Sequence, residues 1–159
     1  MNKEQFREQI LARLAADHQL LLHAAKSSHA AATHEDNAPD SKYETLALEA
    51  SYIAQGQANR AQEIKQAIEA YRQLVLQKFS EQSQIRMSAL VQLEDQQGNE
   101  KQVFIGPAAG GLKLDHEGQE IMLITPDSPL GSELIGRQVD ESFQIEGGAV
   151  CKYEIIDIE

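Results

Sequence analysis

Two long runs with helical spacing constrain the fold of this chain more than any other feature. Residues 2–34 contain no proline and no glycine, and apolar or small side chains recur there three and four positions apart. Residues 43–74 repeat this alternation after a break that contains Pro39. Two such runs joined by a short break are typical of an antiparallel coiled coil, so we predict a coiled-coil hairpin over residues 1–77.

The break at residues 33–44 forms the predicted tip of the hairpin. Three carboxylates, Glu35, Asp36 and Asp40, fall within this segment, and like charges at close range repel one another even in water. Either the tip is simply well solvated or a cation joins it. Ser41 and Glu44 match a capping box that starts the second helix, although Asp40 could serve as the cap in place of Ser41.

The predicted contact line between the two helices is rich in small side chains toward the tip. A slim distal half would suit a narrow channel, but an alanine-rich line can also reflect helix propensity alone. Gly56 interrupts the second helix and has no evident role beyond a possible bend. In the second helix the predicted contact positions are Tyr43, Leu46, Ala50, Ile53, Gln57, Arg60, Ile64, Ala67, Tyr71 and Leu74.

The composition is that of an ordinary soluble protein. Of its 159 residues, 42% are apolar and 25% are charged, which argues against disorder. The net charge of -11 makes DNA binding by the chain itself unlikely and favours a basic protein surface as partner. With Cys151 as its only cysteine the chain forms no internal disulfide. No segment resembles a signal peptide or a membrane span, so we expect a cytoplasmic protein without membrane contact.

A second domain is predicted over residues 85–159. Its strand patterns cover residues 87–94, 101–105, 120–124, 142–145 and 152–158. Asp127 or Ser128 caps a short helix that has Pro129 in its first turn and ends at Gly136. The glycine-rich segment 106–111 lacks the Lys and Ser/Thr of a phosphate loop and indicates a wide turn, and a packed thiol is expected for Cys151. The fold class is therefore α+β, with a helical hairpin followed by a small antiparallel sheet and one short helix.

Segment 127–137, Asp-Ser-Pro-Leu-Gly-Ser-Glu-Leu-Ile-Gly-Arg, resembles the Ser-Pro-Ile-Ala-x-x-Leu-Ile-Gly-Lys signature of the bacterial Gre transcript cleavage factors of RNA polymerase. The closing strand Tyr-Glu-Ile-Ile-Asp-Ile at 153–158 is also similar, and the likeness covers nearly the whole chain. The resemblance implies an FKBP-like fold for the carboxyl-terminal domain. It further implies a transcription elongation factor that binds RNA polymerase and is not an enzyme by itself.

The family's tip pattern, Gly-Asp-Leu-x-Glu-Asn-Ala-Glu-Tyr, aligns with this chain through Tyr43. Asp36 then stands at the first acid, Pro39 at the second, and Asp40 and Glu35 at neighbouring positions. The resemblance implies that the tip enters the secondary channel of the polymerase. There Asp36 and Asp40, with Glu35 as a third carboxylate, would help to hold an Mg²⁺ that is shared with the polymerase and not bound stably by the chain alone. The polymerase's own site would cut the 3′ end of backtracked RNA.

Three other functions are compatible with parts of the sequence. Because Pro39 stands at the second acid position, the chain could occupy the same channel and regulate or inhibit transcription without stimulating cleavage. A prolyl isomerase needs an aromatic-lined pocket, for which the second half offers only Phe104, Phe143 and Tyr153. A coiled coil that only dimerises with itself would leave the 127–137 segment unexplained. If the second domain docks on the polymerase, its apolar sheet face or the helix at 130–134 would supply the contact.

Overall fold

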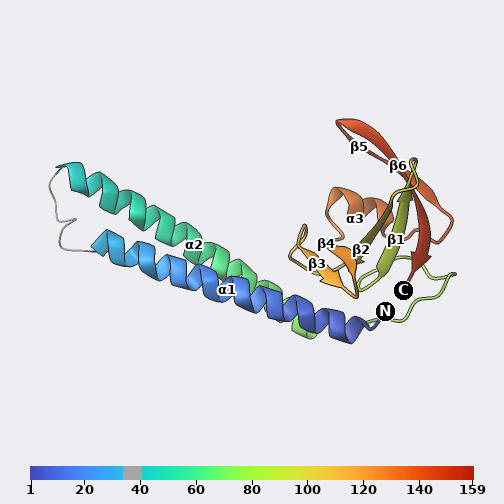
Figure 1. The fold of residues 1–159 in the computed structure, drawn as a ribbon, viewed down its shortest axis with the longest axis horizontal. Coiled ribbons are helices and arrows are strands. Elements are labelled where there is room, and N and C mark those ends of the chain that lie inside the picture. The colour runs from blue at the N-terminus through green and yellow to red at the C-terminus, as the bar shows by residue number, and fades with distance from the viewer. Residues whose placement is uncertain (34–40) are drawn as a thin grey trace. The chain divides into compact units, whose positions relative to one another are not determined.

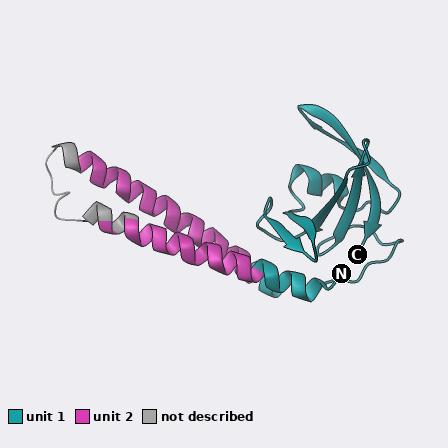
Figure 2. Cartoon of the chain, viewed as in Figure 1, with its two compact units in different colours: residues 1–10, 70–159 teal, residues 11–69 magenta. Residues whose placement is uncertain are grey.

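The structure is a computed structural model that describes the backbone of residues 1–33 and 41–159, and the side chains of residues 1–27, 30 and 44–159. It contains two compact units, shown in Figure 2. Residues 11–69 form the hairpin unit, and residues 1–10 together with 70–159 form the sheet unit. The predicted fold class is confirmed: two long amino-terminal helices precede a small sheet with one short helix. The domain limits at residues 77 and 85 stay predictions.

Helices α1 (Lys3–Thr33) and α2 (Ser41–Gln73) lie side by side in the hairpin unit (Figures 1 and 2). Helix α2 contributes small side chains to this contact: Ala54 and Ala61 are buried, together with the larger Leu14 of α1. Helices approach one another more closely where the side chains between them are small.

The contact line on α2 differs from the predicted one at three positions. Leu46 and Ile53 are exposed, Arg60 is exposed as well, and the alanine one position later is the more buried residue in each case. One residue along a helix turns the side chain by about 100°. The larger side chains therefore lie at the edge of the contact, where they do not hold the helices apart.

Six strands form one sheet in the order β3-β4-β2-β1-β6-β5. The sheet is mixed, because β2 and β4 run parallel while the other neighbours are antiparallel. The prediction of an all-antiparallel sheet is wrong at this one pair. The short strand β3, which pairs antiparallel with β4, is not among the strands predicted from the sequence. With β3 inserted before it, β4 runs in the same direction as β2 and lies next to it. The strands are β1 Leu90–Asp95, β2 Glu100–Ile105, β3 Lys113–His116, β4 Gln119–Ile124, β5 Ser142–Gly147 and β6 Ala149–Ile158.

One face of the sheet packs against the short helix α3 (Pro129–Leu134). Side chains from the two central strands and from β6 meet Leu134 there in the main hydrophobic cluster. Burial of such aliphatic side chains contributes about 1.5–3 kcal/mol each relative to exposure. This cluster includes Val91, Leu93, Val103, Ile105, Leu134 and Ile155.

The other face of the sheet is covered by the ends of the two long helices that belong to the sheet unit. Phe6 of α1 packs edge-on against Phe104 of β2 and His116 of β3, with ring centroids 5.4 Å apart in both pairs. Tyr71 of α2 is fully buried, and its hydroxyl donates a hydrogen bond of 2.9 Å to the carbonyl oxygen of Ala108. Burial raises the pKa of the Tyr71 hydroxyl. The sheet is thus covered on both faces.

We expect Gly106→Ala to destabilise the sheet unit, because a Cβ at Gly106 would lie 2.0 Å from the Tyr71 hydroxyl oxygen. Overpacking of this kind costs about 1–3 kcal/mol of unfolding free energy, which urea unfolding would measure. Gly147→Ala is the matched control, since a Cβ there meets nothing within 4 Å. Equal unfolding free energies for Gly106→Ala and wild type would contradict this close approach.

Lys3 should make stability depend on pH. Its Nζ donates to the carbonyl oxygen of Gln77 at 3.0 Å and lies 4.4 Å from the ring centroid of Phe79. Desolvation lowers the pKa of Lys3 from 10.5 to about 8, although the charge of Glu159 acts in the opposite direction. Between these two pH values the folded protein binds fewer protons than the unfolded chain, so this lysine makes the unfolding free energy rise with pH. Urea titrations across the window should show a smaller rise for Lys3→Met than for wild type; equal slopes would refute the effect.

Candidate functional site

The three acids predicted for the tip lie outside the described residues. Helix α1 is described as far as Thr33 and helix α2 from Ser41 onward, and Glu35, Asp36 and Asp40 fall between these limits. Their roles as carboxylate ligands therefore stay predictions. The structure does place the helix ends that lead into and out of this segment.

In the described part of the chain, no three His, Cys, Asp or Glu side chains are grouped so that they could hold a metal ion. His116 is buried, and its Nδ1 lies 2.6 Å from Oε1 of Gln9. Its Nε2 has no hydrogen-bond partner among these residues. This histidine packs between a helix end and the sheet, where it belongs to the core.

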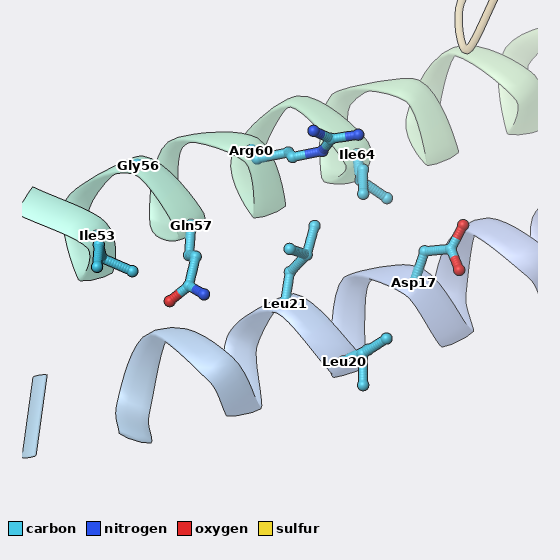
Figure 3. Close-up of a pocket in the computed structure, with 8 residues that line it drawn as sticks. All are labelled: Asp17, Leu20, Leu21, Ile53, Gly56, Gln57, Arg60 and Ile64. Carbon is cyan, nitrogen blue, oxygen red and sulfur yellow. The ribbon is translucent and has the colours of Figure 1, made fainter. Parts of the chain in front are cut away.

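A groove lies between α1 and α2 in the hairpin unit (Figure 3). Its volume is about 530 Å³. Apolar side chains line most of it, with one acidic and one basic side chain at its edges. The lining residues are Asp17, Leu20, Leu21, Ile53, Gly56, Gln57, Arg60 and Ile64. Sequence reasoning missed this groove, because it noted Gly56 only as an interruption of the helix.

Segment 127–137 builds helix α3 and fixes its position. Ser128 is the N-cap: its Oγ accepts a hydrogen bond from the amide of Gly131 at 3.0 Å and donates one to the carbonyl oxygen of Thr125 at 2.7 Å. Of the two predicted caps, Ser128 is therefore confirmed and Asp127 is not. A Cβ at Gly131 would lie 1.9 Å from the same carbonyl oxygen, so glycine permits this close approach. Gly136, at φ +86°, follows the end of the helix as predicted.

A second groove, of about 350 Å³, lies in the sheet unit between α3 and strands β4 and β6. Pro129 at the start of α3 and Met122 of β4 line it, and among the residues that the structure describes Tyr153 is the one aromatic side chain in its lining. This lining lacks the aromatic walls that a prolyl isomerase pocket requires. The predicted polymerase contact through the helix at 130–134 stays a prediction: Leu134 is fully buried in the core, whereas Leu130 also lines this groove.

Cys151 also lines this second groove, and it is exposed. The prediction of a packed thiol is wrong, because residues 146–152 form the end of the β5–β6 hairpin, where every residue is exposed. In Figure 1 this hairpin extends beyond the rest of the sheet. The alternation of side chains in a strand does not show whether both of its faces meet solvent.

No helix in the described residues has the length and apolar character needed to cross a membrane.

Comparison with known proteins gives a match over half of the chain. Residues 80–159 match the family model described as transcription elongation factor, GreA/GreB, C-terminal domain. No curated protein sequence matches the chain significantly.

Several solved structures show a distant likeness. The chain is 21% identical to the transcription factor Gfh1, over 96% of this chain and 92% of that one, with a TM-score of 0.42. A GreA factor homolog 1 (Gfh1) structure from Thermus thermophilus gives 21% identity, 96% and 94% coverage and a TM-score of 0.41. A GreA/GreB factor from Nitrosomonas europaea gives 18% identity, 72% and 91% coverage and a TM-score of 0.38.

We expect Ser128→Ala to lower the unfolding free energy by about 1 kcal/mol, because it removes the N-cap of α3 and its bond to Thr125. Ser132→Ala is the control, since the Ser132 hydroxyl is exposed and bonds only to the carbonyl oxygen of Pro129. Thermal unfolding of both variants would check this expectation. If both variants unfolded at the wild-type temperature, the capping role would be refuted.

Proposed function

Because the chain belongs to the GreA/GreB family of transcription elongation factors, as residues 80–159 match its carboxyl-terminal domain, we propose that it binds RNA polymerase in the cytoplasm and acts on the elongating complex. The family match is the observation that carries this proposal. Members of the family act as accessory factors of the polymerase. The chain then works on the polymerase's reaction and does not catalyse a reaction of its own.

The hairpin is the part that enters the secondary channel in this proposal. Helix α2 contributes small side chains to the contact between the two helices, with Ala54 and Ala61 buried and the larger Ile53 displaced to the edge. A rod built in this way is slim, which suits a narrow channel. The net charge of -11 favours association with a basic surface.

The acids between the two helices supply the chemistry. Asp36 and Asp40, with Glu35 as a third carboxylate, are the hard oxygen donors that Mg²⁺ prefers. The ion is shared with the polymerase, whose own site would cut the 3′ end of backtracked RNA. When bound, the ion would supply activation of the attacking water and stabilisation of the leaving oxygen of a phosphodiester. In this mechanism the residues of this chain only bind and orient the ion.

A second function within the same family is favoured by Pro39, which replaces the second acid of the family's tip pattern. In that case the chain occupies the secondary channel and regulates or inhibits transcription without stimulating cleavage. The two functions share the polymerase and the binding mode. They differ in whether RNA is shortened.

The test uses a stalled, backtracked elongation complex with the full-length protein. The first function predicts RNA shortening above the polymerase's intrinsic rate. The Asp36→Ala, Asp40→Ala double variant should lower the stimulated rate on the order of a hundredfold, because charge stabilisation in the transition state is lost. Polymerase binding, measured by pull-down, should remain.

The matched control is the Glu49→Ala, Glu63→Ala double variant, which removes the same charge from exposed positions of α2. With this variant the polymerase should cleave RNA at the rate stimulated by the wild-type protein. Unchanged cleavage in the Asp36 and Asp40 variant would remove their role as ligands. Wild-type protein that binds the polymerase and slows elongation without RNA shortening would establish the second function instead.

A further inference from the structure

The groove between α1 and α2 has no role in the proposed function. Two large apolar side chains at its walls are left in solvent: Leu20 of α1 is 69% exposed and Ile53 of α2 is 55% exposed. The groove is open at Gly56, where a Cβ would meet nothing within 4 Å (Figure 3). Glycine inside a helix is less stable than alanine, so the opening reduces the stability of the hairpin without serving its internal packing.

The charges at the edges of the groove are opposite and lie on different helices. Asp17 is on α1 and Arg60 is on α2 (Figure 3). Asp17 pairs with Arg13 of its own helix at 3.2 Å. Arg60 is exposed and makes no ion pair with another residue that the structure describes. The groove therefore offers an apolar surface with one acidic edge and one unsatisfied basic edge.

We propose that this groove is the surface through which two copies of the chain associate. A two-fold axis parallel to the helices would place α1 of one copy on α2 of the other. Since Asp17 and Arg60 line the same groove from opposite helices, this symmetry brings Asp17 of each copy to the Arg60 edge of the other. Leu20 and Ile53 of each copy then enter the apolar groove of its partner, and the hairpins form a four-helix bundle.

Charge complementarity favours a second copy as the occupant. A single patch already contains the apolar side chains, the acid and the base that a partner must supply, which is the condition for an isologous contact. The net charge of -11 on each copy opposes association. Salt at physiological concentration screens that long-range repulsion over about 8 Å, whereas contacts inside the groove act at shorter range.

Sedimentation velocity of the full chain over a concentration series, at physiological ionic strength, tests the proposal. We expect a monomer–dimer equilibrium. Leu20→Glu and Ile53→Glu should each raise the dissociation constant at least about tenfold, because each buries a charge in the apolar centre of the contact. Leu48→Glu is the matched control: Leu48 is 53% exposed on α2 but does not line the groove. It should dimerise like wild type.

A charge exchange tests the arrangement of the two copies. Asp17→Arg and Arg60→Asp should each weaken dimerisation, and the double variant should recover it, because the pair is restored across the interface. Circular dichroism should show unchanged helix content in every variant.

Three results would overturn the proposal. One is a monomer across the whole concentration series. If, in addition, Leu20→Glu lowered polymerase binding, the groove would be a contact with the polymerase. Another is a dimer whose dissociation constant does not respond to the groove variants. The third is an equal loss of dimer with Leu48→Glu. A four-helix bundle is thicker than the single hairpin that enters the channel in the proposed function, so the dimer has to dissociate before the chain binds there. RNA cleavage is therefore measured separately, at protein concentrations below the dissociation constant of the dimer.

Discussion

The sheet unit depends on the burial of three side chains from the ends of the long helices. Phe6 and Ile10 of α1 and Tyr71 of α2 are fully buried against the second face of the sheet. A mixed sheet with one short helix buries a single face, so without these side chains Phe104 would meet water. The helix ends are therefore part of the sheet's core, which explains why residues 1–10 belong to the same compact unit as residues 70–159.

The hairpin unit differs from the sheet unit, because small side chains take a large part in its helix contact. On α2, alanines occupy the contact between the helices, and larger apolar residues such as Leu20 of α1 and Ile53 of α2 stand at its edges. Small side chains let the two helices approach closely, but each alanine buries less apolar area than a larger side chain would. Exposed apolar edges are the result, and they give the hairpin surfaces that can meet a partner.

Segment 127–137 is the most specific part of the sequence, and the structure gives it a structural role. Ser128 closes the start of α3 through Thr125, Gly131 allows close approach to the same carbonyl, and Leu134 fills the core. Each residue type is required by a contact within the sheet unit. A segment that identifies a family can thus do so through packing.

The sequence by itself determined the two long helices, the helix end at Gly136 and the order of a hairpin followed by a sheet, and it narrowed the cap of α3 to Asp127 or Ser128. It also carried the family resemblance and named the acids Asp36 and Asp40. These features depend on neighbours in the chain: helical spacing, capping residues and turn glycines act within a few positions.

Only the tertiary structure decided which alanines of α2 face α1, that β4 runs parallel to β2, that Cys151 is exposed, and that a groove opens at Gly56. Strand β3 escaped prediction because it has four residues, of which only His116 is buried. Burial and strand pairing join residues that are far apart in the sequence. They follow from how whole faces fit together, and spacing along the chain does not encode that fit.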